Sequence, residues 1–176
     1  MPDWNYEADG AYFITICVKN RKCILGEIIN GKMELSGIGE MVQKYWDQIP
    51  EHFGNIQLDE FVVMPNHIHG IVVINNLRCV HCRDVACNVS TGNIMSRMSP
   101  KPKSLSTIIR SFKSAVSNWC HKNNFAFFQW QPRFYERIIR DENELNQIRK
   151  YIRNNPIKWD LDRNNSGINQ QSLKNH

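Results

Sequence analysis

The sequence predicts one α+β domain in which helices pack on a β-sheet, and three observations support this. Residues 12–18, 56–64 and 67–74 are rich in β-branched and aromatic side chains, as strands are. Two segments, 36–49 and 104–119, repeat apolar residues every three or four positions, which is typical of amphipathic helices. A chain of 176 residues is long enough for one ordinary domain with its own core.

The first half of the chain is predicted to contain short strands and one helix. Residues 23–29 and 32–35 are expected to be strands, and Asn30-Gly31 between them is typical of a tight turn. Ser36 is a suitable N-cap for the helix that follows, and the apolar repeat of that helix ends at Pro50.

The stretch from 61 to 74 combines a strand pattern with a polar cluster. Pro65-Asn66 predicts the turn of a hairpin between two apolar runs. Alternate side chains of a strand share a face, so His67 and His69 project together. Buried imidazoles need partners, which a shared metal ion would supply, although hydrogen-bonded structural histidines are the alternative. We expect Gly70 to leave room beside them for a ligand backbone.

A segment without sustained periodicity follows, from residue 75 to about 103, and is predicted to be a surface insertion. Cys79 and Cys82, with Cys87 nearby, have a spacing that zinc sites use. A fourth ligand at a suitable spacing is missing, so reduced cysteines in a loop are the default interpretation.

The next helix, capped by Ser104 or Ser106, has an apolar stripe and an opposite face that is basic and hydroxyl-rich. That face either contacts phosphates or is simply solvated. Residues 125–140 then interleave aromatic rings with arginines, as single-stranded nucleic-acid sites do, although some of these rings would instead belong to the core. Within this stretch, 133–139 is predicted to be a strand.

The last helix is predicted to begin at Asp141, because Glu144 three residues later completes a capping box. Its buried stripe consists of apolar residues at 145, 148 and 152. Tyr151 lies beside the stripe, and Asn155 follows four residues later on the same face, before Pro156 ends the helix. Residues 1–161 therefore make up the predicted domain, and 162–176 are expected to be a polar, disordered tail.

Charge is distributed unevenly along the chain. Residues 1–96 hold 7 Lys/Arg and 11 Asp/Glu, whereas 97–176 hold 15 and 6, so the two parts carry net charges of −4 and +9. The basic part favours nucleic acid as a partner. No apolar run is long enough to span a bilayer, and the acidic, aromatic N-terminus is unlike a signal peptide, so no membrane is expected and we predict a cytoplasmic protein.

The histidine pair, the Tyr/Asn pair and the basic, aromatic stretch would together suit phosphoryl transfer. A divalent cation held by two imidazoles and an amide oxygen would polarise a phosphodiester. A tyrosine could attack the phosphorus and form a covalent intermediate.

Two motifs carry a resemblance to a known family. Residues 62–70, Val-Val-Met-Pro-Asn-His-Ile-His-Gly, resemble the HUH signature of single-tyrosine HUH transposases. Residues 151–156, Tyr-Ile-Arg-Asn-Asn-Pro, resemble the Tyr-Ile-x-x-Asn-Pro signature of the REP-associated tyrosine transposases within that superfamily. The similarity covers nearly the whole chain except the insertion at 75–103 and the tail.

The resemblance implies a fold, a site and a substrate. The fold would be the ferredoxin-like HUH fold, an antiparallel sheet with helices packed on it. Tyr151 would form a 5′-phosphotyrosine link and release a 3′-hydroxyl, while His67, His69 and Asn155 would bind Mg²⁺ or Mn²⁺. The substrate would be single-stranded DNA beside short hairpins. Members of the wider superfamily can work as dimers that exchange the tyrosine helix, so a homodimer is also consistent with the resemblance. Candidate DNA contacts are Lys113, Trp130, Arg133, Tyr135, Arg140 and Arg153.

Three alternatives stay open at this point. Tyr135 lies in a basic neighbourhood and is a second candidate nucleophile, although it has no ligand-like partner one helical turn away. The chain could be a hairpin-binding regulator that has lost the chemistry. It could also be a metal-dependent nuclease that uses activated water, with Tyr151 in a structural role.

Overall fold

Four strands form one antiparallel sheet, side by side in the order β4 (Ile56–Val63), β5 (His67–Ile74), β1 (Gly10–Cys17) and β6 (Tyr135–Ile139). The structure is a computed structural model that describes residues 10–75, 104–162 and 165. The predicted α+β class, with helices on an antiparallel sheet, is confirmed. The predicted insertion with its cysteine cluster, most of the predicted tail and the first nine residues lie outside the described residues.

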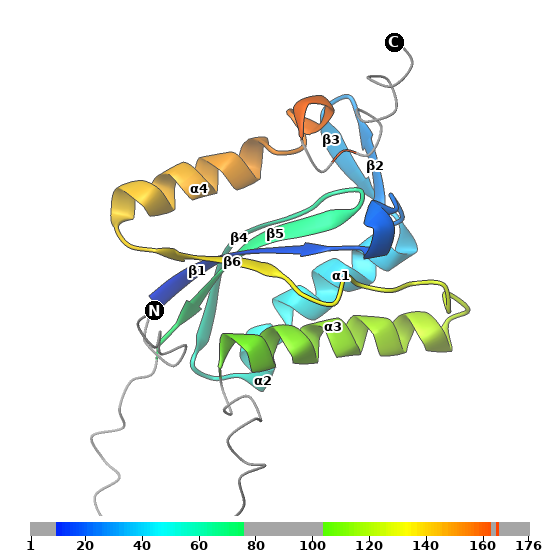
Figure 1. Cartoon of the computed structure of the whole chain (residues 1–176), viewed down its shortest axis with the longest axis horizontal. Coiled ribbons are helices and arrows are strands. Elements are labelled where there is room, and N and C mark those ends of the chain that lie inside the picture. Colours follow the sequence, from blue (N-terminus) through cyan, green and yellow to red (C-terminus); the bar gives the residue numbers. More distant parts are fainter. Residues whose placement is uncertain (1–9, 76–103, 163–164, 166–176) are drawn as a thin grey trace, which may run out of the picture.

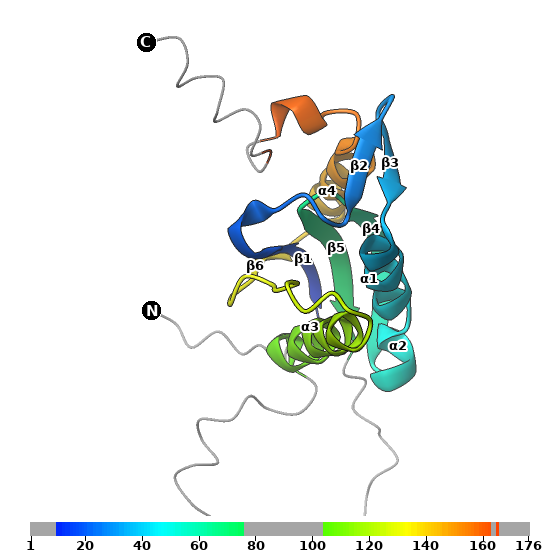
Figure 2. The same ribbon diagram turned by 90° about the vertical axis from the view of Figure 1, so that its right-hand side faces the viewer.

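Helices cover both faces of this sheet (Figure 1). On one face lie α1 (Gly37–Asp47), α2 (Ile49–His52) and α3 (Leu105–Lys122), and on the other lies α4 (Glu142–Asn154). A separate hairpin and two 3-10 turns complete the described part: β2 (Gly26–Ile29) with β3 (Lys32–Leu35), η1 (Lys19–Arg21) and η3 (Trp159–Leu161). Figure 2 shows the hairpin standing beside the end of α4 and η3. Among the described residues, no helix has the length and apolarity needed to cross a membrane.

Side-chain burial differs strongly between the two faces. The larger hydrophobic cluster fills the space between the sheet and α1, α2 and α3, and includes Trp46, Ile109 and Phe112. The smaller cluster, under α4, has four buried members: Phe13, Ile71, Ile139 and Ile152. The α4 face therefore has room for polar side chains, whereas the other face is packed with apolar ones.

Alternation along β5 sends its side chains to these two faces. Ile68 belongs to the large cluster, while Ile71 belongs to the small one on the α4 side. His67 and His69 pair with Cys17 and Thr15 of β1 in the register of the sheet. The shared face predicted for the histidine pair is therefore the face under α4.

Gly70 lies on the opposite face, which corrects the sequence interpretation. A Cβ at this position would come within 2.3 Å of the indole of Trp46. Gly70 therefore leaves room for a buried ring of α1, and the expectation that it makes space for a ligand beside the histidines is wrong. The error follows from the alternation of side chains along a strand, because an even-numbered residue of β5 points to the face opposite His67 and His69.

Most predicted elements are present, with boundaries shifted for identifiable reasons. The strand expected at 133–139 begins at Tyr135, because the ammonium of Lys113 holds the carbonyls of Gln131 and Pro132, 2.5 and 3.4 Å away, in the preceding segment. The first helix ends at Asp47, and Pro50 lies in the first turn of the short α2, where proline is tolerated.

Candidate active site

Two buried histidines and one exposed tyrosine meet on the α4 side of the sheet. His67 and His69 are 0% and 2% exposed, and their Nε2 atoms lie 3.0 Å apart. Tyr151 lies near the end of α4 and is 47% exposed. Its hydroxyl is 3.3 Å from Nε2 of His69, a residue 82 positions earlier in the chain. The fold thus brings a nucleophile candidate into contact with a ligand candidate.

Each imidazole is oriented by a polar neighbour. The Asn66 amide nitrogen donates to the Arg21 carbonyl at 3.1 Å, so the Asn66 Oδ1 faces His67 and accepts from its Nδ1–H at 2.8 Å. This tautomer leaves a lone pair on Nε2 of His67. The hydroxyl of Thr15 lies 2.8 Å from Nδ1 of His69. That ring is therefore oriented like the ring of His67, with Nδ1 toward a polar side chain and Nε2 toward the other histidine. Such outer contacts are typical of metal-binding histidines.

The protonation state of His67 also suits metal binding. Burial lowers the pKa of His67 from its ordinary 6.5 to about 4, while the carboxylate of Asp162 raises that pKa and Arg21 lowers it, both by less than burial does. The ring is therefore neutral at neutral pH. Only the neutral imidazole can offer a lone pair to a cation.

Three observations show that the donor set fits a metal ion. Ligand atoms of His67, His69 and Asp162 all lie within 4.8 Å of one another. Two ligand atoms that bind one metal ion at right angles, each about 2.0–2.1 Å from it, would lie about 3 Å apart. The Nε2 atoms of His67 and His69 are 3.0 Å apart, which matches this spacing. The side-chain oxygen of Asn155 is buried and has no hydrogen-bond partner in the described part of the chain. A buried amide oxygen without a partner is what a cation ligand looks like before the cation binds.

Asp162 was missed by the sequence analysis, which assigned it to a disordered tail. In the structure, Asp162 follows η3, and its backbone N–H donates to the Trp159 carbonyl at 3.0 Å. Its carboxylate lies 4.0 Å from Nε2 of His67 and is 7% exposed. No local pattern marks this residue, because its position depends on how the chain turns back after Pro156.

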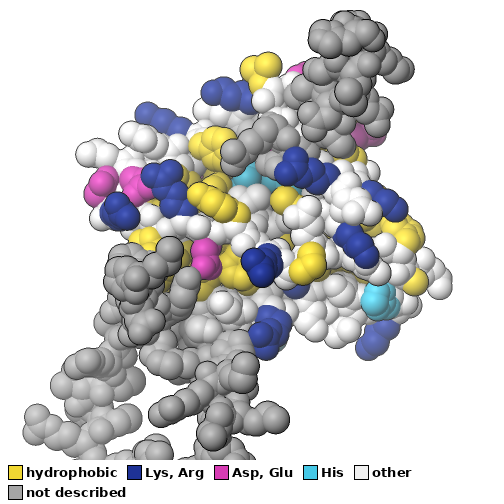
Figure 3. Space-filling model, in the orientation of Figure 1, with side chains coloured by type: hydrophobic (Ala, Val, Ile, Leu, Met, Phe, Trp, Pro, Cys, Tyr) yellow, Lys and Arg dark blue, Asp and Glu magenta, His cyan; other side chains and the backbone are white. Residues whose placement is uncertain are grey.

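Tyr151 lines a groove of about 510 Å³ together with three groups of side chains. Aromatic rings are supplied by Phe13, Tyr135 and Tyr151, and polar groups by Asn154, Asn155 and Asp162. Arg137 and Lys158 are its cations. In the orientation of Figure 1, the space-filling view shows histidine surface between hydrophobic and basic side chains on this side of the molecule (Figure 3).

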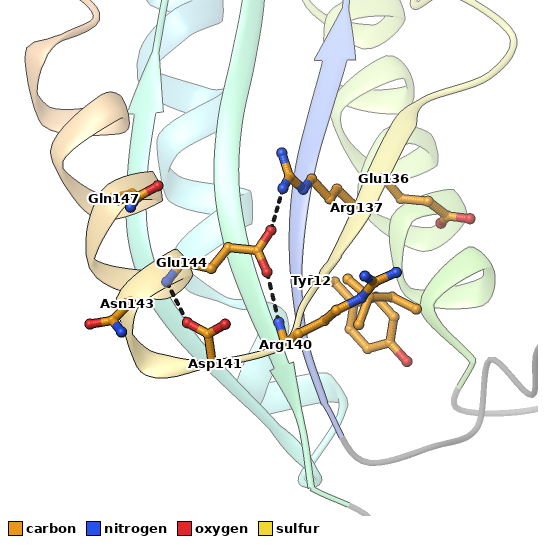
Figure 4. A pocket seen from close by; sticks show the side chains of 9 residues that line it. Tyr12, Glu136, Arg137, Arg140, Asp141, Asn143, Glu144 and Gln147 are labelled. Atoms are coloured by element: carbon orange, nitrogen blue, oxygen red, sulfur yellow. Dashed lines mark hydrogen bonds and ion pairs between the residues drawn. The ribbon is translucent and has the colours of Figure 1, made fainter.

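A second, larger cavity of about 730 Å³ adjoins the start of α4 (Figure 4). Glu144 is central there: its carboxylate pairs with Arg137 at 2.5 Å and accepts from the backbone N–H of Arg140 at 2.9 Å. Its own N–H donates to the Asp141 carboxylate at 2.8 Å, which confirms the predicted N-cap. Glu144 thus fixes Arg137 and Arg140 relative to α4. In a capping box its carboxylate would accept from the backbone N–H of the N-cap, Asp141, but here it accepts from that of Arg140, the residue before the N-cap.

The predicted DNA contacts on the other face have mixed surroundings. Trp130 is 8% exposed and packs against Phe112 and Phe128, so its ring belongs to the core and is not available to stack on a base. Lys113 donates to loop carbonyls, and burial lowers the pKa of its ammonium. Arg133 lies with Lys113 along a cavity of about 760 Å³ beside α3.

Ion pairs attach the tyrosine helix to β4. Arg149 donates to the carboxylate of Asp59 through Nη2 at 2.6 Å and Nε at 3.0 Å, and these bonds lower the pKa of Asp59. Arg153 pairs with Glu60 through Nη2. Since Arg149 and Arg153 flank Tyr151 by two residues on either side, both pairs fix the position of the tyrosine. Arg153, predicted to contact DNA, is thus paired with a carboxylate.

Comparison with known proteins gives three findings. The chain matches no protein-family model. It is similar to an uncharacterized protein of Haemophilus influenzae, with 42% identity over 164 residues that cover 92% of this chain and 88% of that protein. Its structure is similar to that of the REP-associated tyrosine transposase bound to a REP hairpin, with a TM-score of 0.57 and 21% identity, covering 90% of this chain and 74% of the transposase.

The structural similarity identifies the class of fold. With a TM-score of 0.57 over 90% of its length, the chain has a REP-associated tyrosine transposase-like fold. The chain belongs to the same family as the Haemophilus influenzae protein.

Proposed function

We propose that this protein is a metal-dependent transposase or endonuclease that nicks and joins single-stranded DNA beside hairpins. The observation that carries the proposal is the 3.3 Å contact between the Tyr151 hydroxyl and Nε2 of His69, within a histidine pair suited to a metal ion. A fold shared with a transposase bound to a REP hairpin supports hairpin DNA as the partner.

In this proposal, His67, His69 and Asn155 hold Mg²⁺ or Mn²⁺, and Asp162 is close enough to add a carboxylate. When bound, the ion would neutralise charge on the phosphate oxygens and favour nucleophilic attack. The amide oxygen and the carboxylate are ligands of the kind that Mg²⁺ and Mn²⁺ prefer, and the two neutral imidazoles would add nitrogen donors beside them.

Tyr151 is the proposed nucleophile. Its oxygen bonds to the phosphorus as its proton leaves, and the bond from phosphorus to the 3′-oxygen breaks as that oxygen gains a proton. The product is a 5′-phosphotyrosine and a free 3′-hydroxyl. Tyr151 is exposed enough to reach a strand, while Phe13 packs edge-to-face against its ring with centroids 6.0 Å apart and limits its rotation.

Tyr135, the second candidate nucleophile, is less well placed. It packs edge-to-face on Phe13 with ring centroids 6.5 Å apart, and Phe13 also contacts the ring of Tyr151. Among the described residues, Tyr151 is the tyrosine whose hydroxyl contacts a histidine of the site, His69.

The test is covalent capture. The protein is incubated with Mn²⁺ or Mg²⁺ and single-stranded DNA containing the repeats that flank its own gene, labelled at the 3′ end in one sample and the 5′ end in another. We expect 3′-labelled DNA to move with the protein on a denaturing gel, and 5′-labelled DNA to appear as a shorter free strand. Chelator should abolish both products.

Variants make the assignment specific. Tyr151→Phe should abolish the adduct and leave hairpin binding within about twofold, since only one oxygen is lost and surface changes are typically small. Tyr135→Phe is the matched control and should retain the adduct. Adduct formation by Tyr151→Phe would contradict the proposal. Cleavage without any adduct would identify a nuclease that uses water, and binding without cleavage would identify a regulator.

A further inference from the structure

The groove beside Tyr151 contains exposed aromatic surface that folding alone does not explain. Seven large hydrophobic side chains are exposed among the described residues, and three of them line this groove: Tyr135, Tyr151 and Leu161. Tyr135 is 55% exposed although it lies on a strand of the sheet. Exposed apolar surface concentrated in a concave site is typical of ligand binding.

Tyr135 is held firmly despite its exposure. Its ring packs edge-to-face on Phe13, with centroids 6.5 Å apart, and its strand β6 pairs with β1, where Tyr135 lies opposite Thr15. A ring supported along one side keeps its position before a ligand arrives. Such preorganised aromatic platforms lose little conformational entropy when a flat ligand stacks on them.

Cations stand near this ring. Arg137, two residues along β6 and therefore on the same face as Tyr135, has a side chain that is 60% exposed while one guanidinium nitrogen pairs with Glu144. Lys158, between the end of α4 and η3, is exposed on the same groove. The groove thus offers a flat ring together with two positive charges, a combination that single-stranded nucleic acid sites use.

We propose that this groove binds one unpaired nucleotide next to the scissile phosphate, with its base stacked on Tyr135 and its phosphate contacted by Arg137 and Lys158. The proposal rests on the proposed function, because Tyr151 sets where the scissile phosphate lies. A volume of about 510 Å³ is within the range of small-ligand pockets. A base stacked between neighbours inside a duplex cannot offer its face to Tyr135, so this contact favours single-stranded DNA.

The proposal is tested by a double-mutant cycle between Tyr135 and the DNA. Binding of the full-length protein is measured in chelator, with single-stranded DNA that carries the hairpin and a single abasic site moved one nucleotide at a time along the flank. In the native protein, one position should lose about 5- to 140-fold in affinity, as base stacking is worth about 1–3 kcal/mol. With intact DNA, Tyr135→Ala should bind more weakly than the native protein by the same factor. With the DNA that is abasic at that position, Tyr135→Ala and the native protein should bind equally.

Control variants separate stacking from folding. Tyr135→Phe keeps the ring and should keep the affinity, whereas Tyr135→Leu keeps apolar packing on Phe13 and should bind as weakly as Tyr135→Ala. Phe127→Ala removes a ring of similar exposure, 58%, from a different pocket and should change nothing.

The outcomes distinguish this inference from the proposed function. Two results would overturn the nucleotide site. One is that the free-energy losses caused by Tyr135→Ala and by the abasic site add at every position, and the other is that Tyr135→Leu binds with native affinity. The covalent adduct of the native protein with Mn²⁺ is scored separately. Its absence, with the predicted abasic-site pattern present, would overturn the proposed function and leave Tyr135 as a site that binds an unpaired nucleotide.

Discussion

Gly70→Ala gives a sharp test of how the sheet divides its side chains between the two faces. The added Cβ would lie 2.3 Å from Cζ2 and 2.8 Å from Cη2 of Trp46, and 3.0 Å from Cδ2 of Phe61. Non-bonded carbons are most stable at about 3.5–4.0 Å, so the indole would have to retreat by about 1 Å. The change is thus a core perturbation next to a site residue.

Little space is available for that retreat. Trp46 is 1% exposed, stacks on Phe61 with centroids 4.5 Å apart and meets Phe112 edge-on at 5.4 Å. Overpacking of this kind typically costs about 1–3 kcal/mol of unfolding free energy. For a chain of this size, about 2–4 °C of Tm is lost per kcal/mol. We therefore expect Gly70→Ala to lower Tm by about 2–12 °C.

Thermal unfolding followed by circular dichroism, without added metal or DNA, measures this change. Gly54→Ala is the matched control, because Gly54 is exposed and a Cβ there would have no atom within 4 Å. That control should stay within about 0.5 kcal/mol of the native protein.

Repeating the measurement in a Trp46→Phe protein tests whether the added Cβ contacts the indole. Trp46→Phe removes Cζ2 and Cη2, so the loss caused by Gly70→Ala should be smaller in Trp46→Phe than in the native protein. A Gly70→Ala protein with unchanged Tm and lost DNA cleavage would refute the reasoning, since it would place the glycine against a ligand.

Two further predictions concern the supports of the site. Asn66→Ala removes the acceptor of the His67 Nδ1–H and should weaken Mn²⁺ binding by about 10- to 100-fold in a calorimetric titration; unchanged affinity would contradict the orienting role. Asp59 has a pKa lowered by Arg149, so the ion pair stabilises the fold above the unfolded pKa of about 3.9, and its stabilisation is lost as pH falls through the lower folded value. Urea unfolding should show Asp59→Asn about 0.2–1 kcal/mol less stable at pH 6, with the gap closing below about pH 4; a gap that persists in acid would contradict this.

Local patterns were sufficient to predict most of the fold. The Asn30-Gly31 turn is present, with positive φ at both residues, and Ser36 caps α1 by accepting from the Gly39 N–H. Ser104 is the residue that caps α3. These features depend on side chains within a few positions of each other, which is the range over which sequence patterns carry information.

The site was only partly predictable, because its members are joined by tertiary contacts. Alternation placed His67 and His69 on one face, and helical spacing placed Tyr151 and Asn155 together. Asp162 reaches the histidines through the turn after α4, for which no periodic pattern exists.

Interleaved aromatic and basic residues are ambiguous in a sequence. Trp130 and Tyr135 lie in the same aromatic, basic stretch, yet one is buried in the core and the other is exposed on the groove. Tyr135 lies on β6, opposite Thr15 of β1, whereas Trp130 lies before that strand, where an isolated bridge to Val18 brings its ring against Phe112 and Phe128. Both positions depend on pairing with residues more than 100 positions away, so the local pattern cannot distinguish them.

The strict alternation along β5 also bears on how this chain can change over generations. Its odd-numbered positions include the histidine pair, whereas Ile68, Gly70 and Val72 are held by the packing of α1 and α3. A substitution at an even position alters stability first, and one at His67 or His69 alters the proposed metal site first. An inserted or deleted residue within the strand would exchange the two sets. We therefore expect relatives that lose the proposed metal site to replace the histidines one by one while the length of this strand stays fixed.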